Sequence, residues 1–141
     1  PARIQEYCRR TGQPVPEGHG EISRVIYEGL ALKYRWAIER LEKDILHKAI
    51  PVLHIVGGGS NNLLLNQFTA DALRRDVVAG PGEGTVIGNL LVLAQAAGAV
   101  HGREEMSAVV ERSFDTKTYT PGADADKWDA AYARYLKLIE K

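Results

Sequence analysis

The stretch that decides the fold is Val52-Leu53-His54-Ile55-Val56, then Gly57-Gly58-Gly59-Ser60, then Asn61-Asn62-Leu63-Leu64-Leu65-Asn66-Gln67-Phe68. Its opening run of aliphatic and β-branched residues is typical of a parallel strand that is buried on both faces. The glycines allow a sharp turn into a helix, whose first N–H groups point outward toward an approaching anion or ribose. The stretch therefore predicts a strand, a glycine turn and a helix, with the turn as the place for a ligand.

Length and composition describe a single domain with balanced charge. The 141 residues suffice for one hydrophobic core, and 18 basic residues match 18 acidic ones. We therefore expect no nucleic-acid partner and no membrane partner. No apolar run approaches the roughly 20 residues that span a bilayer. The single cysteine, Cys8, cannot form an internal disulfide, which favours a structural thiol in a cytoplasmic protein.

Apolar spacing predicts several helices around this stretch. A short helix carries Cys8, and a long one from Glu21 to Ile45 carries one continuous apolar stripe. Its members are Ile22, Ile26, Leu30, Tyr34, Ile38, Leu41 and Ile45. Further helices are predicted over 60–73, 83–97 and 103–114 and from Trp128 to Ile139, with a second strand at Val77–Ala79. Residues 115–122 are expected to form a loop.

The helix over 60–73 should be capped by Ser60 and amphipathic. Its buried side is predicted to hold Leu64, Leu65, Phe68, Ala72 and Leu73, and its other side Asn62, Asn66, Gln67 and Asp71. That amide-rich side is either hydrogen-bonded to something ordered or a plain polar surface. His54, within the strand, is expected to be a core histidine.

Glycines one turn apart on the helix over 83–97 predict a close approach. Gly84 and Gly88 each weaken this helix by roughly 1 kcal/mol relative to alanine, so tight backbone packing is expected there. The expected neighbour is the first glycine turn.

The order of elements predicts an α/β fold with short parallel strands flanked by several helices. Two strands are too few for such a sheet, because they leave open edges. We therefore expect the leading strands of the domain to lie elsewhere in a longer protein. An uncovered strand edge further predicts that the chain associates with itself.

The glycine turn fails the tests for several known chemistries. A dinucleotide fingerprint needs glycine where Asn62 stands, and no Walker-type Gly-Lys-Ser/Thr exists. The histidines are scattered, so no metal site is predicted. Ser60 lacks the flanking pattern of a nucleophile, and no catalytic residue is assigned. What remains is a turn that offers N–H groups, followed by Asn62, which suits a ribose, a base edge or an α-phosphate.

Several segments closely resemble the C-terminal domain of rhamnulokinases, which belong to the FGGY carbohydrate kinases of the actin-like ATPase (ribonuclease H-like) superfamily. The matching segments are 4–8, 11–13, 21–22, 53–67, 69–72 and 78–89. The glycine turn alone fits many FGGY kinases. The His-Ile-Val before it and the Leu-Leu-Asn-Gln after it narrow the resemblance to rhamnulokinases.

The resemblance implies ATP-dependent phosphorylation of L-rhamnulose to L-rhamnulose 1-phosphate in rhamnose catabolism, with Mg²⁺. It also implies that Gly57, Gly58, Gly59 and Ser60 contact the adenosine and the α-phosphate, and that Asn62 approaches the adenine. Gly82 and Gly84 depart from the usual Pro-Val-Glu-Ala-Thr of the family, which weakens any assignment to the second turn.

The resemblance also implies that residues 1–141 are part of a C-terminal FGGY-type domain, without its leading strands and the N-terminal lobe. No acidic residue here aligns with the catalytic aspartate of the family, so the chain alone is expected to be inactive and to meet the sugar through the missing lobe. Two alternatives stay open. One is a kinase for another sugar, such as fuculose or xylulose, and the other is a non-catalytic nucleotide-binding module.

Overall fold

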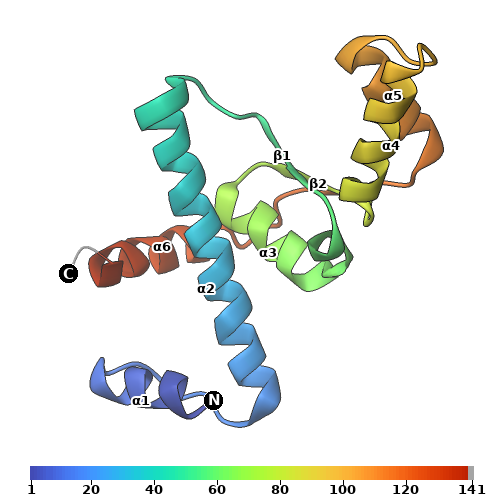
Figure 1. Ribbon diagram of the computed structural model, residues 1–141. Helices are drawn as coiled ribbons and strands as arrows, with labels where there is room; N and C mark the ends of the chain where they lie inside the picture. Colours follow the sequence, from blue (N-terminus) through green and yellow to red (C-terminus); the bar gives the residue numbers. More distant parts are fainter. Residues whose placement is uncertain (140–141) are drawn as a thin grey trace.

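A computed structural model describes residues 1–139, which build a small three-stranded sheet beside a long helix (Figure 1). The strands are β1 (Val52–Ile55), β2 (Asp76–Ala79) and β3 (Lys117–Tyr119), in the spatial order β1-β2-β3. β1 and β2 are parallel, with Leu53 opposite Val77, and α3 (Leu63–Leu73) connects them. The predicted parallel β–α–β unit is therefore confirmed.

β3 corrects the prediction of a loop over 115–122. It pairs antiparallel with β2 and places Tyr119 opposite Val77. Three residues with one buried side chain give too short an alternation to stand out in a sequence. As a result β3 covers the outer edge of β2, while the outer edge of β1 has no partner strand within residues 1–139.

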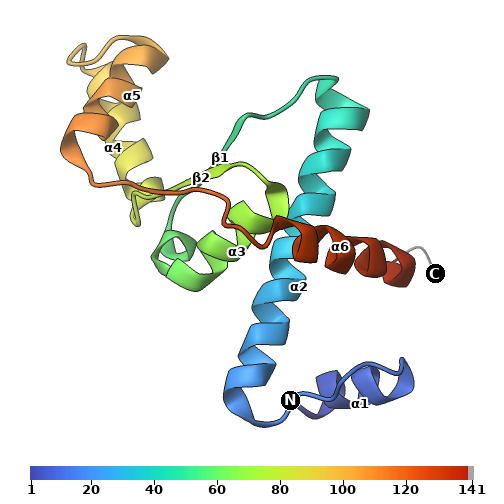
Figure 2. The ribbon, with the colours of Figure 1, turned by 180° about the vertical axis from the view of Figure 1, so that it is seen from behind.

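The helices before the sheet are α1 (Ala2–Arg10) and α2 (Gly18–Arg40), and α2 continues into a π-helical turn (Leu41–Leu46). The helices after β2 are α4 (Gly84–Ala96), α5 (Gly102–Ser113) and α6 (Ala125–Ile139). α2 packs across α3, and α6 contacts both of them, as Figure 2 shows from behind. No helix in the described part of the chain is both long and apolar enough to cross a membrane.

The core lies between the sheet and α3. Ala70, Val77, Ala79 and Tyr119 are buried there, and Leu53 and Ile55 pack against them. Cys8 is buried as well, as expected of a structural thiol. His54 is exposed, and so the prediction of a core histidine is wrong, because β1 is an edge strand whose second face is not covered by the described residues.

The predicted stripe of α2 is only partly buried. Ile26, Tyr34 and Ile45 are exposed, whereas Ala31 and Leu32, which lie off the stripe, are buried. A small side chain allows two helices to approach closely, and α2 crosses α3 with this neighbouring face. The apolar pattern thus predicted the helix correctly and its contact face incorrectly.

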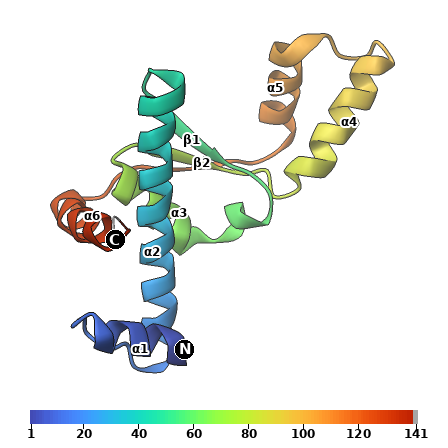
Figure 3. The same cartoon turned by 60° about the vertical axis from the view of Figure 1, so that its left-hand side comes forward.

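α4 and α5 form a hairpin that stands away from the sheet (Figure 3). It joins the rest of the fold at Gly84, where an added Cβ would lie 3.1 Å from the Val56 Cβ and 3.6 Å from the Gly57 nitrogen. The predicted close approach to the glycine turn is therefore confirmed for Gly84. It is wrong for Gly88, where an added Cβ would meet nothing within 4 Å.

Candidate functional site

The glycine turn between β1 and α3 is held by hydrogen bonds on both sides. Gly57 has a φ of 79°, which favours glycine, and its N–H donates to the Pro81 carbonyl at 3.0 Å. The Ser60 N–H and hydroxyl both donate to the Gly57 carbonyl, at 3.0 and 2.7 Å. These contacts fix the chain immediately before and after Gly58 and Gly59.

Gly58 and Gly59 form the open part of the turn. Both are exposed, and their N–H groups have no acceptor among the described residues. An added Cβ on Gly58 would meet nothing within 4 Å, and one on Gly59 only the Ile55 Cγ2 at 3.8 Å. The turn therefore presents two unused donors beside open space, as an anion or a polar ring would require.

Ser60 does not cap α3, which corrects the prediction. It lies in a 3₁₀ turn (Gly58–Asn61) that separates the strand from the helix, and it is buried. Asn62 is the N-cap, since its Oδ1 accepts a hydrogen bond from the Leu65 N–H at 3.1 Å. The Ser60 hydroxyl is directed at the Gly57 carbonyl instead, as is its N–H, so Ser60 supports the shape of the turn.

Asn62 keeps part of its hydrogen-bonding capacity. Its oxygen is used by the cap, while its Nδ2 group has no acceptor among residues 1–139 and the residue is half-buried. The second glycine turn, Gly80-Pro81-Gly82 after β2, lies beside the neighbouring Asn61, because an added Cβ on Gly82 would be 3.6 Å from the Asn61 Nδ2. The two turns together form one surface at the carboxyl ends of β1 and β2, where ligands of open α/β sheets bind.

The amide-rich side of α3 binds ordered groups, and these belong to the chain itself. The Gln67 Nε2 donates to the Thr120 carbonyl at 2.9 Å, and Asp71 accepts the Gly122 N–H at 2.8 Å. Asn66 is fully buried, which corrects its predicted place on the polar side. Leu64 is exposed and was predicted to be buried. The sequence did not predict that the Asn66 side chain binds the Ser60 carbonyl in the glycine turn. The unusual amide content of this helix was the feature that could have indicated it.

Several hollows lie along α2, and one of them reaches the glycine turn. A cleft of about 410 Å³ runs under the glycine turn and is lined by Tyr34, Ile38, Leu53, Gly59 and Asn66, with other mainly apolar residues. Its walls are formed by α2, β1 and the start of α3. Because it opens beside the uncovered edge of β1, it is suited to apolar side chains and offers few groups for a charged ligand.

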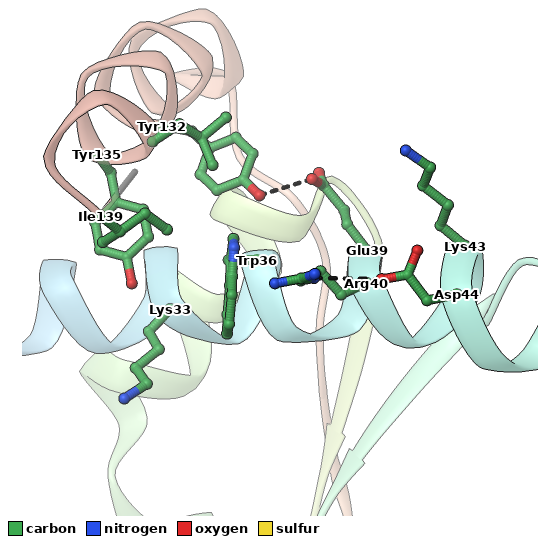
Figure 4. Close-up of a pocket in the computed structure, with 10 residues that line it drawn as sticks. Lys33, Trp36, Glu39, Arg40, Lys43, Asp44, Tyr132, Tyr135 and Ile139 are labelled. Atoms are coloured by element: carbon green, nitrogen blue, oxygen red, sulfur yellow. Dashed lines mark hydrogen bonds and ion pairs between the residues drawn. The ribbon is translucent and has the colours of Figure 1, made fainter. Parts of the chain in front are cut away.

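A second groove, of about 730 Å³, separates α2 from α6 (Figure 4). Several of its charged groups have partners, since Glu39 accepts a hydrogen bond from Tyr132 at 2.7 Å and Arg40 pairs with Asp44 at 3.3 Å. Burial and the bond to Glu39 raise the pKa of the Tyr132 phenol. Lys33 points away from α6. We therefore assign this groove to the packing of α6 against α2.

The chain resembles known sugar kinases over most of its length. Residues 1–97 match the C-terminal domain of the FGGY family of carbohydrate kinases. The chain is 49% identical over 136 residues to the rhamnulokinase of Bacteroides thetaiotaomicron, which covers 96% of this chain and 28% of that protein. It is 46% identical over 138 residues to the rhamnulokinase of Ligilactobacillus salivarius, covering 98% of this chain and 28% of that protein.

A solved structure supports the fold. The xylulose kinase from Rhodospirillum rubrum superposes with a TM-score of 0.67 at 24% identity, over 92% of this chain and 26% of that one. The chain spans just over a quarter of the length of these relatives. The expected C-terminal part of an actin-like α/β fold is thus confirmed, and the chain belongs to the FGGY family of carbohydrate kinases.

Proposed function

We propose that this chain is the ATP-binding part of a kinase that phosphorylates L-rhamnulose to L-rhamnulose 1-phosphate in the cytoplasm. The names and identities of its rhamnulokinase relatives support the sugar. The nucleotide would lie on the glycine turn, with the N–H groups of Gly58 and Gly59 toward its α-phosphate and ribose. Gly57 and Ser60 shape that turn, and the free Nδ2 group of Asn62 is available to the adenine.

One observation carries the proposal. Gly58 has an ordinary φ, and none of residues 1–139 occupies the space of its missing side chain. Neither the backbone conformation nor the internal packing therefore requires glycine at this position. Gly88 shares these two properties, but Gly58 differs from it because it lies in the glycine turn at the carboxyl end of β1 and its N–H has no acceptor among the described residues. A ligand that approaches the backbone closely at this turn accounts for a glycine there.

Replacing Gly58 with valine tests the nucleotide site in the full-length kinase. We expect the KM for ATP to rise about tenfold or more, because the side chain enters the space of the phosphate or ribose. The KM for L-rhamnulose should stay within about twofold, since this side chain would face only the nucleotide. Gly88→Val is the matched control, as Gly88 is also exposed with open space around it. An equal loss of affinity for sugar and ATP would contradict the assignment.

The sugar and the metal ion require residues from outside this chain. Within residues 1–139 no group of three or more His, Cys, Asp or Glu side chains could hold a metal ion, so we assign no metal ligand to them. Mg²⁺, where it is bound, neutralises charge on the phosphates of ATP. We expect the 141-residue chain alone not to phosphorylate L-rhamnulose. Robust sugar-dependent ADP release by the purified chain would overturn this expectation.

The choice of sugar is tested with the full-length kinase. Its kcat/KM for L-rhamnulose should exceed that for L-fuculose and D-xylulose by at least about tenfold, which corresponds to about 1.4 kcal/mol, the scale of one net hydrogen bond. A higher kcat/KM for either of the other two sugars would contradict L-rhamnulose as the substrate. It would not contradict the proposed nucleotide site.

We also propose that the isolated chain self-associates through β1. The outer edge of β1 and the apolar cleft beside it are uncovered within residues 1–139, and an uncovered edge is a template for another strand. Light scattering over a concentration series should show a dimer or larger species. A monomer at high micromolar concentration would contradict the proposal.

A further inference from the structure

Asn66 lies in the first turns of α3, directly under the glycine turn. Its exposed fraction is 0%, and its Nδ2 donates to the Ser60 carbonyl at 2.8 Å. Its Oδ1 is buried as well and has no hydrogen-bond partner among the described residues. The side chain therefore makes a single polar contact, and that contact joins the helix to the turn.

Stability alone gives a poor reason for an asparagine here. A buried amide oxygen without a partner is unfavourable by roughly 1–3 kcal/mol, whereas an aliphatic side chain of similar volume would fill the same space without that loss. Thr69, one turn further along α3 and also fully buried, satisfies its hydroxyl on the Leu65 carbonyl at 2.7 Å, within its own helix. Asn66 differs from Thr69 because its hydrogen bond connects the helix to the glycine turn.

The contact to Ser60 completes a chain of bonds around the open glycines. The Asn66 Nδ2 donates to the Ser60 carbonyl, and the Ser60 N–H and hydroxyl donate to the Gly57 carbonyl. The Gly57 N–H in turn donates to the Pro81 carbonyl. Gly58 and Gly59 lie between these fixed points, and their own N–H groups are left unused. The directions of those two groups are thus set largely by contacts of the residues on either side, together with the Asn62 N–H, which donates to the Gly59 carbonyl at 3.1 Å.

We infer that Asn66 is a positioning residue, which fixes the glycine turn so that the Gly58 and Gly59 N–H groups face the nucleotide. This inference rests on the proposed nucleotide site and adds a fully buried residue that acts on the ligand through the turn. Groups that are held in place before binding avoid the entropy cost of being ordered when the ligand binds. In addition, small displacements of binding groups reduce activity strongly. Loss of the Asn66 bond should therefore weaken ATP binding without altering the sugar site.

The test compares two buried substitutions on α3 in the full-length kinase. Asn66→Leu keeps the branching at Cγ and removes the bond to Ser60, while Thr69→Val keeps the shape and removes a bond within the helix. We expect Asn66→Leu to raise the KM for ATP between about tenfold and a hundredfold, with the KM for L-rhamnulose unchanged. Thr69→Val should leave the KM for ATP within about twofold. Thermal unfolding of each variant shows that the assays compare folded protein, and Asn66→Ala, which cannot clash, replaces Asn66→Leu if that variant does not fold.

The Gly58→Val variant separates this inference from the proposed function. If Gly58→Val raises the KM for ATP and neither Asn66 variant does, the nucleotide site stands and the positioning role is wrong. If Asn66→Leu and Thr69→Val raise the KM for ATP equally, Asn66 contributes only to general stability and the inference is again wrong. If Gly58→Val has no effect, the proposed nucleotide site itself is overturned, and the role of Asn66 with it.

Discussion

The β1–α3–β2 unit and the α4–α5 hairpin are both rich in apolar residues, yet they use them differently. In the first, Val77 is fully buried between β1 and β3. In the second, Leu93 is 67% exposed and Val92 60% exposed on a helix that stands away from the sheet. An apolar pattern thus identifies a face that avoids water, but it does not identify what covers that face. Within the described residues, much of the apolar face of the hairpin is left exposed.

We expect the largest difference in stability between the two regions when one negative charge is introduced into each of them. Val77→Asp buries a carboxylate without a partner and should lower the free energy of unfolding by about 4 kcal/mol or more. Val92→Asp should change it by less than about 0.5 kcal/mol, because the side chain is already in water. Urea unfolding followed by tryptophan fluorescence measures both. A loss at Val92 as large as that at Val77 would mean that the hairpin is covered in solution.

A second test concerns the point where the two regions meet. Gly84→Val should destabilise the chain by about 2 kcal/mol, since its added atoms would press against Val56 and the start of the glycine turn. Gly88→Val, one turn further along the same helix, enters open space and should have little effect. Thermal unfolding of the two variants gives the comparison. Equal melting temperatures would show that the hairpin moves freely relative to the sheet.

The helix starts of the two regions differ as well. Asn62 caps α3 with its side chain, whereas Glu83, the N-cap of α4, makes no such bond. Asn62→Ala should therefore lower the free energy of unfolding by about 1 kcal/mol, and Glu83→Ala by much less. Urea midpoints with unchanged slopes would report the difference. If both variants lose the same amount, the Asn62 cap contributes nothing beyond an ordinary polar residue.

The smallest effect concerns pH and distinguishes the packed side of the fold from the hairpin. Asp129 on α6 accepts a hydrogen bond from Arg35 at 2.6 Å and pairs with Arg74 at 2.5 Å. The bond from Arg35 and the nearby positive charges hold the pKa of the Asp129 carboxyl below its ordinary value of 3.8. The stabilisation is therefore complete above pH 3.8 and is lost as the pH falls through the lower pKa of the folded state.

We accordingly expect α6 to loosen on acidification before α5 does. Amide hydrogen exchange at decreasing pH should show the change in α6, and Asp129→Asn should remove much of its pH dependence. Simultaneous loosening of α5 and α6 in the wild type would indicate general acid unfolding instead.

Much of this arrangement could be predicted from local sequence. The run 52–56 and the glycines after it predicted the strand, the turn and the following helix, because backbone freedom and hydrophobic period act over a few residues. The close approach at Gly84 was predictable for the same reason, as a glycine inside a helix is unfavourable without a neighbour.

What could not be predicted depends on contacts between distant segments. β3 is defined by its pairing with β2, and Asn66 is buried because the turn folds back over the first turns of α3. Spacing alone assigns an asparagine to the outside of a helix. Similarly, the stripe of α2 predicted a helix but could not reveal that Ala31 and Leu32 lie at its crossing with α3.

The position of β3 in the sequence also affects how the chain folds. β1, α3 and β2 follow one another directly, so their contacts can form while little of the chain is ordered. β3 reaches β2 only after the whole α4–α5 hairpin has been placed between them, which requires the closure of a long loop. Until then the outer edge of β2 offers unpaired backbone groups to any neighbouring strand. Newly synthesised chains are therefore most prone to aggregate in the interval between emergence of β2 and arrival of β3, and a chaperone that shields this edge would raise the yield of folded protein.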